Sequence, residues 1–232
     1  MADDIVRWIT VNGVHIPIKE GQTTEEAIKD RQIKQSTKEA VRKNIDDYAE
    51  AHGDIFLSNK LHENFSTDEI KKCVDMVGEC YKEFGLNPSN RTEQLIFTLS
   101  ADKKLEDYFA TASYHNGVLS MNPESARLKE EGFSVIYHEF GHAVELKLRE
   151  LYKTNFSNYD NLTNRLVHDA NTYRARTFPN STEHISNYGL TNKRELIAEG
   201  VRDYMLNKDK ASPMSQSIMR TLKKYLNKKV GK

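Results

Sequence analysis

The sequence predicts an α+β fold that is mostly helical, with a small β-sheet above a central helix and an N-terminal β-hairpin followed by a helical appendage. Three observations support this prediction. At 232 residues the chain is long enough to bury one substantial core. Several segments repeat apolar residues at helical spacing, and two stretches alternate apolar and polar residues around an Asn-Gly pair, a strong hairpin signal. We expect residues 1–53 to form the hairpin and appendage and residues 54–232 the main domain.

The first segment, "WITVNGVHIPIKEGQ", alternates around Asn12-Gly13 and predicts the N-terminal hairpin. Two polar stretches follow, "TTEEAIKDR" and "STKEAVRKNIDDYAEAH". They predict two helices, the first capped by Thr23 or Thr24 and the second by Ser36. Few of their positions are apolar, which indicates an appendage or linker.

The main domain is expected to open with a core helix in "FSTDEIKKCVDMVGECYKEFG". Ser66 and Glu69 form a capping box at its start, and Gly85 ends it. A second hairpin is predicted within residues 108–122, around an Asn-Gly pair and before Pro123. These signals are local, so they predict elements and not how the elements pack.

Four further helices are expected in the second half of the chain. Their approximate ranges are 130–150, 164–174, a segment that begins at Thr191 or Asn192, and a last helix from Ser215 to the basic C-terminal end. The stretch between the first and third of these is polar and rich in Asn.

Composition excludes several classes of function. Lys plus Arg and Asp plus Glu both total 34, so no net field favours nucleic acid or an anionic membrane. Asp3, Asp4 and Arg7 interrupt the N-terminus where a secretory signal needs an apolar run. Cys73 and Cys80 would lie on one helix about 10 Å apart, too far for a disulfide. We therefore expect a cytoplasmic protein with reduced thiols.

The stretch "VIYHEFGHAVELKLRE" carries the strongest chemical signal. On a helix, His138 and His142 project from one face about 6 Å apart, as two zinc ligands require. Glu139 lies on the same turn and can act on a water molecule as general base without binding the metal. The alternative is an amphipathic helix on which both histidines are ordinary polar residues beside the apolar stripe.

The rest of the coordination shell discriminates between these interpretations. The metzincin extension is excluded because Glu145 and Leu148 stand where it needs Gly and His. Glu195 and Glu199 lie four residues apart on a later predicted helix. One carboxylate can bind zinc, and the other can accept the second ring N–H of a ligand histidine. The competing interpretation of this pair is a solvent-exposed acidic surface.

Together, "HEFGHAVE" and "ISNYGLTNKRELIAEG" resemble the catalytic domain of anthrax toxin lethal factor and its relatives, including the clostridial Pro-Pro endopeptidases. The likeness covers roughly residues 108–206 and implies a zincin-like metallopeptidase of the gluzincin type. It implies that His138, His142 and Glu195 bind zinc and that Glu139 is the general base. Tyr188 matches the family's active-site tyrosine, and Glu199 matches the carboxylate that supports a ligand histidine.

The N-terminal segment "RWITVNGVHIPIKEGQTTEEAI" resembles hairpins at the ends of phage minor head proteins and prophage-encoded proteins. This likeness implies a phage or prophage origin. A phage-encoded protein would be associated with the virion or with the host cytoplasm.

The function predicted from the sequence is a zinc-dependent endopeptidase that binds an extended peptide, with no role for nucleic acid or membranes. One arm of the second hairpin is expected to pair with the substrate backbone. Gly141 would let that strand approach the helix, or it is simply a tolerated helical glycine. His168 and His184 are candidates for substrate contacts, with surface positions as the alternative. The alternatives to an active zinc endopeptidase are a non-enzymatic phage or prophage module that retains a zinc site, and a toxin-like effector with the same chemistry.

Overall fold

The structure is a computed structural model, and it describes residues 5–53, 55–86, 95, 97–108, 111–152, 159–180 and 192–230. It is an α+β fold in which helices predominate. The chain divides into two compact units, residues 1–47 and residues 48–232. Within the described residues, none of the helices combines the length and the apolar character needed to cross a membrane.

The first unit contains the predicted hairpin, which is confirmed. Strands β1 (Ile5–Val11) and β2 (Val14–Lys19) pair antiparallel. The turn residues Asn12 and Gly13 have φ of 49° and 79°, the left-handed conformation that favours Asn and Gly. A small apolar core forms where Ile16 and Ile18 contact Ala27 of helix α1.

Helix α1 (Thr24–Ala51) is a single helix of 28 residues, so the prediction of two helices with a cap at Ser36 is wrong. Thr23 and Glu26 do form a capping box at its start. Between the two predicted helices the sequence has no Gly or Pro to stop the first. The hydroxyl of Ser36 donates to the carbonyl of Ile33, and the helix continues.

The second unit is built around a four-stranded mixed sheet of order β3-β4-β6-β5. Strands β3 (Ile55–Leu57), β4 (Phe97–Ala101) and β6 (Val118–Met121) are parallel, and β5 (Ala112–His115) pairs antiparallel with β6 at the edge. The β5–β6 hairpin was predicted and is confirmed. Strands β3 and β4 were not predicted, because short parallel strands lack hairpin signals.

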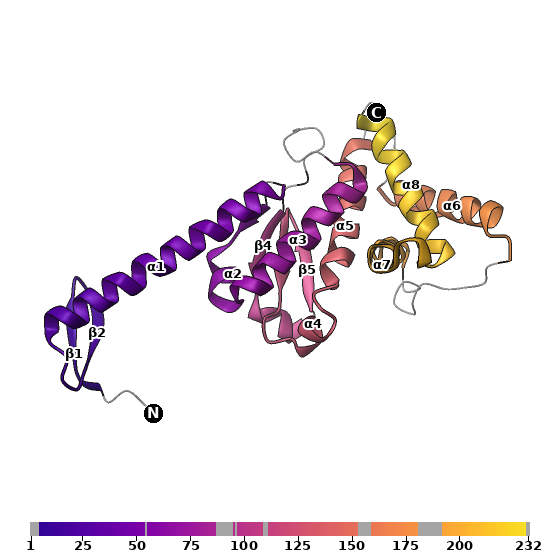
Figure 1. Ribbon diagram of the computed structural model, residues 1–232. Coiled ribbons are helices and arrows are strands. Elements are labelled where there is room, and N and C mark those ends of the chain that lie inside the picture. Colours follow the sequence, from indigo (N-terminus) through magenta and orange to yellow (C-terminus); the bar gives the residue numbers. More distant parts are fainter. Residues whose placement is uncertain are drawn as a thin grey trace. The chain divides into compact units, whose positions relative to one another are not determined.

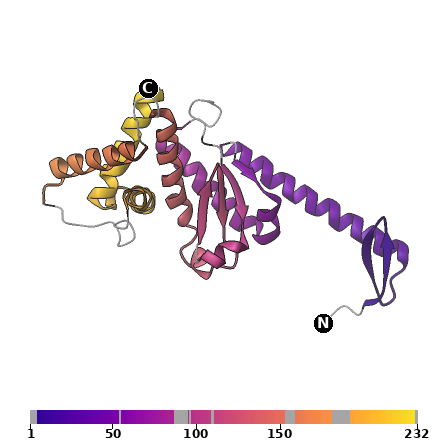
Figure 2. The ribbon, with the colours of Figure 1, turned by 180° about the vertical axis from the view of Figure 1, so that it is seen from behind.

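Helix α3 (Thr67–Phe84) lies across one face of this sheet (Figure 1). In the opposite view the sheet lies in front of α3 (Figure 2). Both ends of α3 were predicted from its caps: Ser66 and Glu69 form the capping box, and Gly85 has φ 62°. The short helix α2 (Asn59–Asn64) contacts β4. Cys73 and Cys80 are buried as free thiols, as expected.

The predicted helix 130–150 begins later than expected. A short helix α4 (Ala126–Glu130) precedes α5 (Val135–Tyr152), and between them Gly132 and Phe133 have φ of 61° and 68°. Two successive residues in this conformation cannot continue a right-handed helix. Phe133 is buried and packs edge-on against Phe65, so tertiary packing holds the break.

Helix α5 is the central element of the second unit. Its Phe140 stacks on Phe97 of the sheet and on Phe84 of α3, with ring centroids 5.1 and 5.7 Å away. Three helices complete the unit: α6 (Tyr159–Thr177), α7 (Lys193–Asn207) and α8 (Pro213–Val230). Helix α7 crosses α5, and α8 packs on α6 and α7 (Figures 1 and 2). The 3-10 turns η1 (Lys103–Tyr108) and η3 (Lys208–Lys210) lie in connections.

Candidate metal centre

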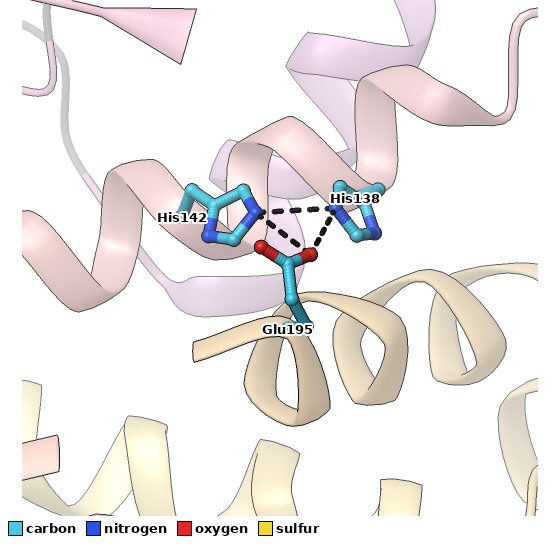
Figure 3. A group of neighbouring side chains, drawn as sticks. All are labelled: His138, His142 and Glu195. Carbon is cyan, nitrogen blue, oxygen red and sulfur yellow. Dashed lines mark hydrogen bonds and ion pairs between the residues drawn. The ribbon is translucent and has the colours of Figure 1, made fainter. Parts of the chain in front are cut away.

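His138 and His142 of α5 and Glu195 of α7 point toward one another across the two helices (Figure 3). The Nε2 atoms of the two histidines are 3.1 Å apart. The Oε2 atom of Glu195 lies 3.2 Å from Nε2 of His138 and 3.5 Å from Nε2 of His142. The structure thus brings the three predicted ligands to one point, although more than fifty residues of sequence separate Glu195 from the two histidines.

Glu195 reaches the histidines because α5 and α7 approach very closely at Gly141. A Cβ atom built on Gly141 would lie 2.7 Å from the backbone Cα of Ala198, closer than real Cβ contacts. The expectation that Gly141 admits a strand is therefore wrong, since the close neighbour is helix α7. Asn192 begins α7 by accepting hydrogen bonds from the amides of Arg194 and Glu195, which fixes Glu195 in the first turn.

Glu199 lies one turn after Glu195 and supports His138 from the other side of its ring. Its Oε1 is 2.7 Å from Nδ1 of His138. A neutral His138 therefore carries its proton on Nδ1 and directs the lone pair of Nε2 at His142 and Glu195. Arg202, whose Nη1 is 3.8 Å from the same carboxylate oxygen, also binds Glu131 and Ser134 and so ties Glu199 to the start of α5.

The side-chain atoms that converge at this point could bind a cation. With the proton of His138 on Nδ1, only His142 can bring a hydrogen into the cluster, and the buried Oε2 of Glu195 makes no hydrogen bond. Burial lowers the pKa of His138, but the hydrogen bond that it donates to Glu199 and the charges of Glu139, Glu199 and Glu195 raise the pKa above its usual value overall. The cluster therefore favours a positive charge, and a bound metal ion would replace the proton.

Glu139 is buried beside this cluster without belonging to it. Its side chain is only 7% exposed, and the main-chain N–H of Tyr114 in the edge strand β5 donates to its carboxylate. Burial raises the pKa of Glu139 to about 7, against the smaller opposing effects of His138 and Tyr114. A carboxyl group with a pKa near neutrality can both accept and donate a proton at physiological pH.

This raised pKa predicts a pH-dependent effect on the stability of the metal-free protein. The pKa of Glu139 is about 7 in the folded protein and 4.5 in the unfolded chain. Its contribution to the stability of the fold is therefore fully present below pH 4.5 and is lost as the pH rises through about 7. Glu139→Gln removes the ionisation, so the variant should gain stability over wild type on the order of 3 kcal/mol between pH 4.5 and 8. Urea unfolding of both proteins in chelator at several pH values measures this difference. A difference that is flat with pH would contradict the assigned pKa.

The structure also shows a buried charge network that the sequence interpretation missed. Glu145, one turn beyond His142, is fully buried and binds the Nε of Arg149 at 2.5 Å and the hydroxyl of Thr163 from α6. Arg194 contributes a longer ion pair, with its Nε 3.7 Å from Oε2 of Glu145. Burial first, and the nearby positive charges of His138, Arg194 and Arg149, lower the pKa of His142 to about 3. The spacing of Glu145 and Arg149 was the only sequence signal for this network.

An open cavity of about 560 Å³ adjoins the cluster. Its lining includes His142, Glu195, Tyr114 of β5 and the first turn of α7. Strand β5 pairs only with β6 among the described strands, so it is the edge strand of the sheet beside the cavity.

Three other predicted positions have different outcomes. Tyr188 and His184 lie outside the described residues. His168 is exposed on α6, as the surface alternative expected, and does not line the cavity.

No protein-family model matches this chain, and a search of curated proteins gives no match either. The resemblance to the lethal factor group is therefore carried by the motif residues themselves.

Proposed function

We propose that the chain is a zinc-dependent endopeptidase with a zincin-like domain of the gluzincin type. One observation carries this proposal: a buried carboxylate, Glu139, lies next to three converging ligand atoms and is not one of them. A structural metal site has no use for such a group and commonly has four protein ligands. A hydrolytic site needs it as the proton acceptor for an attacking water molecule.

The donor set favours zinc. Two imidazole nitrogens and one carboxylate oxygen are a common ligand set of catalytic zinc, and they leave a coordination position for water or substrate. When bound here, Zn²⁺ would supply a Lewis acid that lowers the pKa of a water molecule toward 7.

The residues of the chain would perform the remaining steps. Glu139 accepts the proton of the attacking water and returns it to the leaving amine. Edge strand β5 binds an extended substrate through backbone hydrogen bonds. Tyr188 is proposed as hydrogen-bond donor to the oxyanion, on the resemblance alone.

Metal analysis coupled to digestion of a peptide library tests this function. The full chain should bind one equivalent of zinc and cleave internal bonds of some peptides. Cleavage should disappear on dialysis against a chelator and return when one equivalent of zinc is restored. Stoichiometric zinc without cleavage of any peptide would contradict the proposal.

Glu199→Gln should weaken zinc binding by about 10- to 100-fold, because the amide no longer holds the Nδ1 proton of His138 through a charged hydrogen bond. Competition with a chromogenic chelator measures the affinity. Glu130→Gln serves as the control, because it removes an exposed carboxylate at the end of α4. This variant should bind zinc like wild type. Equal affinities of the Glu199 and Glu130 variants would show that Glu199 does not support the site.

The non-enzymatic phage or prophage module has one observation in its favour. On the N-terminal hairpin, Val6 and Trp8 are 59% and 58% exposed. Large apolar side chains on a surface often mark a site of contact with another protein. Such a module would bind zinc and cleave nothing, which is the outcome that contradicts the peptidase.

A further inference from the structure

The cavity beside His142 and Glu195 has a pronounced chemical bias toward hydrogen-bond donors. Besides His142, Glu195, Thr163 and Tyr114, its polar lining includes Asn164 of α6 and Asn192, Lys193 and Arg194 at the start of α7. The acceptor oxygen of Asn192 already receives two backbone amides, and that of Asn164 receives Nζ of Lys193 at 2.7 Å. The amide oxygens of both asparagines are therefore engaged within the fold.

The donors on the same wall are largely unused. Lys193 has three N–H donors, and one of them donates a hydrogen bond to Asn164. Arg194 is 52% exposed, and its one ion pair in the described part of the chain uses Nε, so its terminal nitrogens have no hydrogen-bond partner there. The side-chain NH₂ groups of Asn164 and Asn192 make no hydrogen bond to other described residues. An incoming group that accepts several hydrogen bonds would complement this wall.

The charges around the cavity have the same bias. Lys193 and Arg194 are the positively charged residues that line the cavity, and Glu195, the proposed metal ligand, is the carboxylate that lines it. Behind the lining, the fully buried Glu145 pairs with Arg149 and, at 3.7 Å, with Arg194. Lys193 makes no ion pair with any described residue, so its charge is not neutralised within the described part of the chain. The whole chain has equal numbers of acidic and basic residues, so this surplus is local. A carboxylate is the substrate group that satisfies both the donors and the surplus charge.

We propose that this cavity is a specificity subsite that binds the carboxylate of an Asp or Glu side chain in the substrate, with Arg194 and Lys193 as its determinants. The inference rests on the proposed peptidase function, since it names the substrate class of the same site. His142 and Glu195 line the cavity together with Tyr114 of the edge strand. The acidic residue is therefore close to the bond that is cleaved.

Peptide binding to the full-length Glu139→Gln protein loaded with zinc tests the subsite without requiring turnover. The probes are octapeptides, acetylated and amidated at their ends, in which each position in turn carries Glu, Gln or Lys in an alanine background. At one position we expect Glu to bind at least about tenfold more tightly than Gln, with Lys weakest. A second set with a free C-terminal carboxylate distinguishes a side-chain carboxylate from a terminal one.

Two variants and a control assign the effect to residues. Replacing Lys193 and Arg194 together by Gln should remove the preference for Glu over Gln, and Arg194→Lys should retain most of it. Lys82→Gln, an exposed lysine of α3 that does not line the cavity, should leave the preference unchanged. Circular dichroism and zinc stoichiometry check that each variant is folded.

The outcomes separate this inference from the proposed function. If no position favours Glu over Gln, or if only a free C-terminus is favoured, the acidic subsite is wrong, whatever the wild-type protein cleaves. If the preference is present and depends on Lys193 and Arg194, but the wild-type protein cleaves none of the favoured peptides, the subsite stands and the peptidase function is wrong.

Discussion

Glu139→Gln should reduce peptide cleavage by about 10³-fold or more while one zinc ion per chain remains bound. The amide keeps the size of the side chain but cannot accept a proton from the attacking water, and general base catalysis is worth about 10² to 10⁴ in rate. Glu139 is not among the converging ligand atoms, so its replacement should leave the metal in place. Initial rates on a cleaved library peptide and metal analysis of the same sample measure both quantities.

Glu150→Gln is the matched control, because it makes the same substitution on the same helix at an exposed position. It should cleave at the wild-type rate. A Glu139 variant that cleaves as fast as this control would show that the base is another group. A variant that loses zinc along with activity would instead place Glu139 among the ligands.

Gly141→Ala should disrupt the metal centre although it touches no ligand. The added methyl group meets the backbone of Ala198 at 2.7 Å, and a helix backbone cannot rotate away as a side chain can. We expect α5 and α7 to separate, at a cost of about 1–3 kcal/mol in the free energy of unfolding. Because Glu195 is carried by α7, zinc affinity should fall at least about tenfold. Chemical unfolding and chelator competition measure the two effects.

Two other glycines provide graded controls. At Gly78 of α3 the same methyl group would make only ordinary contacts, 3.4 Å from the carbonyl of His52, so Gly78→Ala should be neutral or stabilise by up to about 1 kcal/mol. At Gly200 it would meet the flexible end of Ile218 at 2.5 Å, so the cost should be smaller than at Gly141. If all three variants behaved alike, the close approach of α5 and α7 would not govern the site.

The sequence predicted best those elements whose ends are determined by neighbouring residues. Helix α3 begins at the capping box of Ser66 and Glu69 and ends at Gly85, and both signals act within one turn. The two hairpins likewise follow from Asn-Gly pairs that adopt the left-handed conformation in the turn.

Predictions failed where distant contacts or the absence of a stop signal decided the outcome. Parallel strands β3 and β4 are paired by residues about forty positions apart and have no turn between them to mark them. The break before α5 depends on the burial of Phe133 against Phe65. Helix α1 continues through Ser36 because a capping residue starts a helix only where the preceding chain is not already helical.

For the candidate site, the sequence by itself determined which side chains could share a metal, because helical spacing places His138 beside His142 and Glu195 beside Glu199. Only the tertiary structure decided that these two pairs meet, since that depends on the contact at Gly141. It also decided that Glu139 is buried with a raised pKa and that Arg194 and Lys193 line the adjoining cavity. Burial and electrostatic environment arise from residues far apart in the chain, and no local spacing encodes them.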